Sequence, residues 1–323
     1  MRFKIVSTSP TFGFYVKEPV DYLEQNGCEV ELIPQGKKLT EDELVACAGG
    51  SDAMIVGVEK ITRRVLTGGN RLKVIAKHGA GVDNIDMNAA TERKIVVTSA
   101  PGANSDAVAD LTFGLFLSLA RKIPFADRSV KAGGWPRIVG TQFNGKTLGI
   151  VGSGQIGKKV AKRATGFDLK VLIYDVVKDH EFAARHGVQY LPLDEVLSQS
   201  DFVSIHVPLM EATRNMIGER ELGLMKKEAF LVNIARGGVV DEKALFDALK
   251  EQRIRGAALD VFSQEPAKGN PLLELENVIA TPHMGMYTSE ALNVTGMICV
   301  RNIVAVLKGN KPEFLNNPQV FAV

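Results

Sequence analysis

Three polar residues, Arg236, Glu265 and His283, follow apolar segments that are predicted to be strands of one parallel sheet. A histidine can take up a proton near neutral pH, and a carboxylate can orient the imidazole ring. A guanidinium can bind a carboxylate through two parallel hydrogen bonds. Because ligands of open α/β sheets bind beyond the carboxyl ends of the strands, the three side chains are predicted to lie close together. Such a set could remove the hydroxyl proton of a 2-hydroxy acid while hydride leaves the same carbon.

A glycine-rich turn stands between an apolar strand and an amphipathic helix. It contains Gly152, Gly154 and Gly157. In such a turn the first glycine permits the bend, the second lets the backbone approach a pyrophosphate, and the third lets helix and strand pack closely. The N–H groups near Gln155 and Ile156 would then face the anion. Asp175 ends the next strand and would accept hydrogen bonds from ribose hydroxyls, which favours NAD over NADP.

Strands alternate with amphipathic helices along the chain, which predicts parallel sheets covered by helices on both faces. Five β-branched strands are predicted before Pro101 and six between Thr147 and Pro282, with long helices starting near Asn104 and spanning 289–308. We therefore predict an α/β chain of two doubly wound domains, one flavodoxin-like and one of the Rossmann type, joined by a two-stranded hinge.

The domain bounds follow from this alternation. Residues 1–101 and 290–323 are predicted to form a substrate-binding domain, and residues 102–289 an NAD-binding domain. Two chain crossings would make a hinge with a cleft in which cofactor and substrate meet.

Bulk composition sets limits on function. The chain has 323 residues and a formal net charge of +2, without a long run of one sign, which argues against nucleic acid or a membrane as the partner. Cys28, Cys47 and Cys299 lie far apart, which argues against disulfides or a zinc site and favours a reducing compartment. The segment LTFGLFLSLA is too short to span a membrane. We expect a cytoplasmic protein that binds no metal.

Four ordered motifs, GSGQIG, NIARGGVVDE, ALDVFSQEP and ATPHMG, resemble the signatures of the D-isomer-specific 2-hydroxyacid dehydrogenases. The similarity extends to KHGAGVDNID and GANSDAVAD, and so covers nearly the whole chain. Within this family, the chain is most similar to the branch that oxidises 3-phosphoglycerate for serine biosynthesis. The resemblance implies NAD as the cofactor and a small anionic substrate. It also implies a homodimer, for which the LTFGLFLSLA helix and its neighbours would offer the apolar face. It also implies a short form that lacks the appended regulatory domain of some relatives.

The resemblance assigns further residues. Backbone N–H groups from Gly79 to Val82 would bind the substrate carboxylate. Asn104 would bind substrate or orient the hinge, although a plain helix N-cap explains an asparagine at this position equally well. The predicted substrate contacts are Lys77, Gly79, Ala80, Gly81, Asn104 and Arg137. The additional predicted cofactor contacts are Val207, Ile234, Ala235, Asp260 and Gly285. Lys77 and Arg137 would bind a substrate phosphate, although Gly57 stands where such enzymes often have another arginine.

Several functions stay open at this point. The substrate could be phosphoglycerate, hydroxypyruvate or glyoxylate, or sulfolactate. A relative of another class, an NAD-sensing corepressor that binds peptides, would share the fold, and so would a nucleotide-binding domain without this chemistry.

Overall fold

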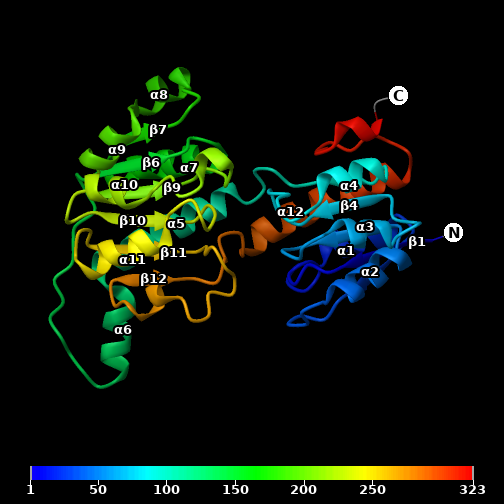
Figure 1. The fold of residues 1–323 in the computed structure, drawn as a ribbon, viewed down its shortest axis with the longest axis horizontal. Helices are drawn as coiled ribbons and strands as arrows, with labels where there is room; N and C mark the ends of the chain where they lie inside the picture. The colour runs from blue at the N-terminus through cyan, green and yellow to red at the C-terminus, as the bar shows by residue number, and fades with distance from the viewer. Residues whose placement is uncertain (1, 322–323) are drawn as a thin grey trace. The chain divides into compact units, whose positions relative to one another are not determined.

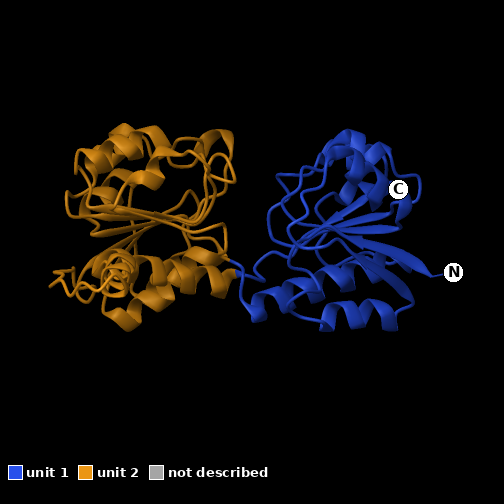
Figure 2. Cartoon of the chain, turned by 90° about the horizontal axis from the view of Figure 1, so that it is seen from below, with its two compact units in different colours: residues 1–104, 286–323 blue, residues 105–285 orange. Residues whose placement is uncertain are grey.

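The computed structural model describes residues 2–321, and the chain divides into two compact units (Figures 1 and 2). Unit 1 contains the residues up to Asn104 and those from Met286 onward, and unit 2 contains Ser105–Gly285. The chain therefore passes from unit 1 into unit 2 once and returns once. Each unit is a parallel sheet between two layers of helices, as predicted.

The sheet of unit 1 has five strands in the order β2-β1-β3-β4-β5, and every neighbouring pair is parallel. The strands are β1 (Phe3–Ser7), β2 (Cys28–Leu32), β3 (Ala53–Val56), β4 (Val74–Lys77) and β5 (Val96–Thr98). This is the flavodoxin-like order predicted for the first domain. The central strands β3 and β4 are almost wholly buried, as expected for a parallel sheet covered on both faces.

Two helix layers cover this sheet. On one face lie α1 (Glu18–Gln25) and α12 (Ser289–Leu307), which share a buried cluster with β1 and β4. On the other face lie α2 (Glu41–Gly50), α3 (Arg63–Thr67) and α4 (Met87–Glu92). Thr40 and Glu43 form a reciprocal capping box that begins α2.

Helix α12 is long and apolar enough, by length and composition alone, to cross a membrane. In the structure 56% of its most apolar window is buried. Its residues Cys299, Val300 and Ile303 pack in the core of unit 1. The helix thus serves as a core helix of unit 1.

The sheet of unit 2 has seven parallel strands in the order β12-β11-β10-β9-β6-β7-β8. They are β6 (Thr147–Val151), β7 (Lys170–Tyr174), β8 (Gln189–Tyr190), β9 (Phe202–Ile205), β10 (Phe230–Asn233), β11 (Gly256–Leu259) and β12 (Val278–Ala280). Six strands were predicted, and β8 is the additional one. It has only two residues, so no apolar run marks it.

Helices cover both faces of this sheet as well. One face carries α5 (Ser105–Arg121) and α7 (Gln155–Ala164), which pack on each other. The other carries α9 (Leu193–Gln199), α10 (Glu219–Leu224) and α11 (Glu242–Lys250). Helix α8 (His180–His186) follows β7, and four 3-10 turns complete the elements: Thr165–Phe167, Glu211–Thr213, Pro271–Glu274 and, in unit 1, Pro318–Phe321.

One exposed apolar surface of unit 2 lies beside α5 rather than on it. The large side chains of α5, such as Phe113 and Phe116, are buried in the core of the unit. The helix that follows, α6 (Ile123–Lys131), has no buried residue. Residues 132–140, which follow α6, are here called the arm. Helix α6 exposes Ile123, Phe125 and Val130, and the arm exposes Trp135 and Val139.

A neutral histidine is buried in unit 1. The ring of His78 contacts the hydroxyls of Ser9 and Thr11 and meets Phe12 edge-on. Burial lowers the pKa of His78 to about 4. Between that value and the ordinary value near 6.5, the unfolded chain binds a proton that the folded unit excludes.

The free energy of unfolding should therefore fall as the pH drops from about 6.5 to about 4. His78 contributes up to about 1.4 kcal/mol per pH unit in this window. Urea unfolding at pH 5, 6 and 7 should show a shallower dependence in His78→Asn than in the wild type. Substitution of the exposed His180 by Asn serves as the control. Identical slopes in the wild type and His78→Asn would contradict the assignment.

Candidate active site

The glycine turn between β6 and α7 is crowded at two positions and open at one. A Cβ at Gly157 would lie 2.0 Å from the carbonyl oxygen of Gly152, so a side chain there would separate helix from strand. Gly152 has φ +100°, and a Cβ would meet the backbone of His206 at 2.9 Å. A Cβ at Gly154 would meet no atom within 4 Å. The turn therefore leaves space at Gly154 for a ligand to approach the backbone.

No side chain caps the first turn of α7. Its leading N–H groups belong to Gln155 and Ile156, the residues predicted to face a pyrophosphate. Together with the open space at Gly154, this arrangement fits the diphosphate of a dinucleotide.

Asp175 follows β7 and turns back toward the glycine turn. Its carboxylate accepts hydrogen bonds from the N–H of Ser153 (2.5 Å), the hydroxyl of Ser153 (3.0 Å) and the N–H of Val177 (2.9 Å). Burial alone would raise the pKa of Asp175, but these hydrogen bonds outweigh it and hold the pKa below its ordinary value. The group is a fixed carboxylate with acceptor capacity left for ribose hydroxyls.

Arg236 lies in the loop after β10. The side chain of Asn233 holds this loop, donating to the carbonyl of Arg236 (2.9 Å) and accepting from the N–H of Ala235 (3.1 Å). The guanidinium donates to the carbonyl of Ala235 at 2.8 Å. A Cβ at Gly237 would lie 2.0 Å from the carbonyl carbon of Phe262, so this loop packs tightly on the one after β11.

His283 and Glu265 are brought together. Nδ1 of His283 lies 2.8 Å from Oε2 of Glu265, and Oε1 of Glu265 accepts from the N–H of Phe262 at 3.1 Å. Burial alone would raise the pKa of Glu265. The hydrogen bond and charge of His283, the Phe262 N–H and the charge of Arg236 outweigh that effect, so the pKa lies below its ordinary value.

Asp260, predicted as a cofactor contact, holds the segment that carries His283. Its carboxylate is 1% exposed and accepts from the hydroxyl of Thr281 (2.5 Å) and the N–H groups of Met284 and Gly285 (2.9 Å each). His283 itself adopts φ +52°, a left-handed conformation that costs a non-glycine residue about 1–2 kcal/mol. The buried carboxylate offsets this strain through its hydrogen bonds. Sequence spacing carried no indication of this contact.

The other predicted cofactor residues of unit 2 fall into two groups. Ile234 is buried, and its side chain lies with Asp260 beside Gly285, where a Cβ would be 3.2 Å from Oδ2 of Asp260. Val207 lies next to the glycine turn, with Cγ1 2.9 Å from where a Gly152 Cβ would be. Both groups follow strands at the carboxyl edge of the sheet.

The predicted substrate loop follows β4 in unit 1. The N–H of Gly79 donates to the carbonyl of Lys77 at 2.9 Å, so it is already used within the loop. The N–H groups of Ala80, Gly81 and Val82 are the remaining candidate donors for an anion. Asn104 directly precedes α5, at the point where the chain leaves unit 1.

Two predicted substrate residues have surroundings that the sequence did not indicate. The ammonium of Lys77 donates to the carbonyl of Gly57 and to Oδ1 of Asn84. Arg137 lies exposed on the arm of unit 2. In Figure 1 the arm extends away from the loops that follow β10 and β11.

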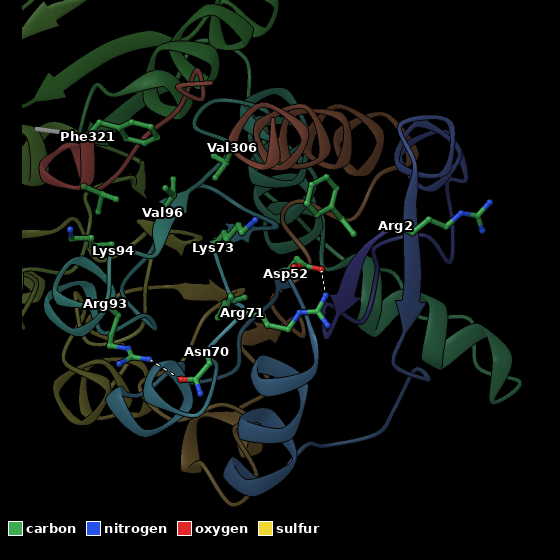
Figure 3. A pocket seen from close by; sticks show the side chains of 13 residues that line it. Arg2, Asp52, Asn70, Arg71, Lys73, Arg93, Lys94, Val96, Val306 and Phe321 are labelled. Carbon is green, nitrogen blue, oxygen red and sulfur yellow. Dashed lines mark hydrogen bonds and ion pairs between the residues drawn. The ribbon is translucent and has the colours of Figure 1, made fainter. Parts of the chain in front are cut away.

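A pocket of about 820 Å³ lies at the opposite, amino edge of the sheet of unit 1 (Figure 3). Its cationic lining residues are Arg2, Arg71, Lys73, Arg93 and Lys94. Asp52 faces it and accepts from Arg71 at 2.9 Å. Since the substrate loop follows the carboxyl end of β4, this pocket is distinct from the predicted site. Among residues 2–321, no cluster of three or more His, Cys, Asp or Glu side chains could hold a metal ion.

The two glycines permit a matched test. Gly157→Ala should destabilise unit 2 by about 1–3 kcal/mol or more, because its Cβ would collide with backbone. Gly154→Ala should leave the melting temperature nearly unchanged but weaken NADH binding, because its methyl group occupies the open space. Thermal unfolding and NADH fluorescence titration measure the two effects. Unchanged NADH affinity in Gly154→Ala would exclude this turn as the pyrophosphate site.

Comparison with known proteins bears directly on this arrangement. Residues 113–285 match the model of the "D-isomer specific 2-hydroxyacid dehydrogenase, NAD binding domain". The chain is 45% identical over 98% of its length to D-3-phosphoglycerate dehydrogenase of Methanocaldococcus jannaschii, of which it spans 60%. It is 42% identical over 90% of its length to glyoxylate reductase of Thermococcus litoralis, covering 91% of that protein.

A solved structure agrees with these relationships. D-lactate dehydrogenase of Aquifex aeolicus, complexed with NAD and lactic acid, has a TM-score of 0.82 at 30% identity, covering 97% of this chain and 99% of that one. Unit 2 contains all of the residues that match this NAD-binding domain. The chain belongs to the D-isomer specific 2-hydroxyacid dehydrogenase family.

Proposed function

We propose that this chain interconverts a D-2-hydroxy acid and its 2-oxo acid, with NAD as the hydride carrier. The observation that carries the proposal is the 2.8 Å contact of His283 with Glu265, with the charge of Arg236 acting on the same carboxylate. The relatives spanned over most of their length, such as the glyoxylate reductase, are named for chemistry of this type.

When bound, NAD supplies the nicotinamide carbon that accepts or donates the hydride. His283 moves the proton. Because Nδ1 faces Glu265, Nε2 is the nitrogen left to face the substrate hydroxyl, and it takes the proton as the alcohol is oxidised. Glu265 fixes the orientation of the ring and stabilises the imidazolium that forms.

Arg236 supplies positive charge beside this pair. Its guanidinium is suited to the carboxylate and the 2-oxo oxygen of the substrate, which it would bind with parallel hydrogen bonds. In the reverse direction the same charge polarises the 2-oxo group as His283 returns the proton. In unit 1, we propose that the N–H groups of Ala80–Val82 bind the substrate carboxylate and that Asn104 contacts the substrate.

We further propose a cytoplasmic homodimer. The three cysteines are all unpaired, which suits a reducing compartment. The exposed apolar side chains of α6 and the arm, including Trp135 at 87% and Val139 at 83%, supply the surface that a second copy would cover. Arg137 lies on the same arm, and its predicted contact with substrate would have to come from that assembly.

Replacing His283 by Asn tests the proton transfer. Asparagine tolerates the left-handed backbone at this position, so the fold should be kept. Turnover of 2-oxo acids should fall by about two to four powers of ten, while NADH affinity stays nearly unchanged. Stopped-flow NADH oxidation and NADH titration give both values. If the wild type binds NADH tightly but reduces no 2-oxo acid, the result would instead favour an NAD-sensing corepressor that binds peptides.

The dimer is tested by removing the exposed apolar side chains of the arm. Light scattering at micromolar concentration should give twice the chain mass for the wild type. The double variant Trp135→Ser, Val139→Ser should shift toward the monomer, because it loses apolar area at the proposed contact. Val176→Ser, at an equally exposed valine outside this surface, is the control. A monomeric wild type would refute the dimer.

A further inference from the structure

A polar cluster at the carboxyl edge of the sheet of unit 1 stands beside the proposed substrate loop. Strands β3 and β4 pair with Val56 opposite Lys77, so the turn after β3 meets the start of the loop after β4. The cluster comprises Gly57, Glu59, Lys77 and Asn84. All four come from the two segments that leave these neighbouring strands.

The ammonium of Lys77 is held inside this cluster. It donates to the carbonyl of Gly57 and, at 2.9 Å, to Oδ1 of Asn84. Asn84 in turn donates to the carbonyls of Gly57 (3.1 Å) and Glu59 (2.6 Å). Lys77 precedes the loop and Asn84 follows it, so their hydrogen bond ties the two ends of the loop together.

Glu59 supplies the negative charge of the cluster. Its Oε2 accepts from the N–H of Gly57 at 2.7 Å, and the charge of Lys77 acts on the same carboxylate. Burial raises the pKa of Glu59 above its ordinary value. The backbone N–H groups of Glu59 and Gly57, the charge of Lys77 and the hydroxyl of Thr8 act in the opposite direction but do not outweigh burial. The side chain thus lies half-buried at the loop rather than out in solvent.

The charges of the two segments do not favour a dianion. Residues 57–61 and 77–86 contain two lysines, Lys60 and Lys77, and three carboxylates, Glu59, Asp83 and Asp86. Binding a phosphate strongly requires cations or several N–H donors directed at it. Here Lys77 is already bonded and faces Glu59, which leaves the backbone N–H groups of the loop to hold a single carboxylate.

We propose that Glu59 sets the substrate class: the loop accepts small 2-oxo acids without a phosphate, such as glyoxylate or hydroxypyruvate, and discriminates against phosphorylated ones. Lys77 is then a positioning residue that holds the loop, not a phosphate ligand. This inference rests on the proposed function. A negative charge beside the loop repels the second and third charges of a phosphorylated substrate more than it repels a lone carboxylate.

The test compares hydroxypyruvate with 3-phosphohydroxypyruvate, which differ only in the phosphate. Assays are run at pH 8, far above the ordinary pKa of a glutamate side chain. The wild type should show at least a tenfold higher kcat/KM for hydroxypyruvate. Glu59→Gln keeps the shape of the side chain and removes its charge. It should raise kcat/KM for 3-phosphohydroxypyruvate, and so lower the ratio of the two kcat/KM values at least threefold. Glu24→Gln, at an exposed glutamate of α1, is the control and should leave the ratio unchanged.

A merely structural role for Glu59 would lower kcat/KM for both substrates together, and that result overturns the proposal. A wild-type preference for the phosphorylated substrate overturns it as well. Lys77→Met adds an independent readout: a loss shared by both substrates supports positioning, whereas a loss confined to 3-phosphohydroxypyruvate contradicts it.

A binding measurement separates this inference from the proposed function. If the wild type reduces no 2-oxo acid, the proposed function fails, and thermal shifts with D-glycerate and D-3-phosphoglycerate in the presence of NADH decide the inference. Stronger stabilisation by D-glycerate, reduced in Glu59→Gln, supports it. Stronger stabilisation by D-3-phosphoglycerate in the wild type refutes it.

Discussion

The hydrogen bonds to the buried carboxylate of Asp260 are the interactions on which the proposed catalytic arrangement in unit 2 depends. Three donors from the segment after β12 converge on it, and that segment carries His283 in a left-handed conformation. Burying a carboxylate without such partners would cost several kcal/mol, so the charge and the loop stabilise each other. Asp260 therefore fixes the backbone that holds the imidazole of His283 against Glu265, and it need not touch the substrate to do so.

The parallel sheet explains why distant residues meet. Strands β10, β11 and β12 are neighbours, and each delivers one polar segment at the same edge. Gly237 has no room for a side chain, which lets the Arg236 loop lie directly on the loop after β11. Sheet topology brings the three loops to the same edge, and the close packing at Gly237 brings the Arg236 loop into contact with the loop after β11.

The sequence predicted the sheets better than the short elements. Long β-branched runs and glycine-terminated helices identified the two parallel sheets, because burial on both faces leaves a strong compositional pattern. Strand β8 and helices α4 and α6 were missed, since they are short and α6 has no buried face. The LTFGLFLSLA helix and its neighbours were predicted, from the family resemblance, to offer a dimer face; within that group the large side chains of α5 are buried in the core of unit 2, and the exposed apolar side chains lie on the neighbouring α6 and the arm.

The sequence likewise predicted some site residues well and the contacts that support them poorly. Motif spacing identified the residues at strand ends, including His283 and Glu265, whose contact the structure contains. Two further carboxylates act through contacts made across neighbouring loops: Asp260 holds the segment that carries His283 in unit 2, and Glu59 accepts from the N–H of Gly57 in unit 1. No spacing rule encodes such contacts, because they depend on strand pairing and on which side chains find unpaired N–H groups. The use of the Gly79 N–H within its own loop was likewise invisible in the sequence.

The position of α12 has a consequence for how the protein is made. The helix packs on β4 and α1, and Asn317 bonds the backbone of Val97 and Ile95, yet these partners are separated by more than two hundred residues. On the ribosome, the first hundred residues emerge with one face of their sheet covered only in part, by α1, while unit 2 is contiguous and can close as soon as it is synthesised. Unit 1 must wait for the last segment, so the nascent chain carries an exposed apolar surface through most of its translation. Because unit 1 is built from two separate segments of the chain, it is the unit that most needs protection by chaperones during synthesis.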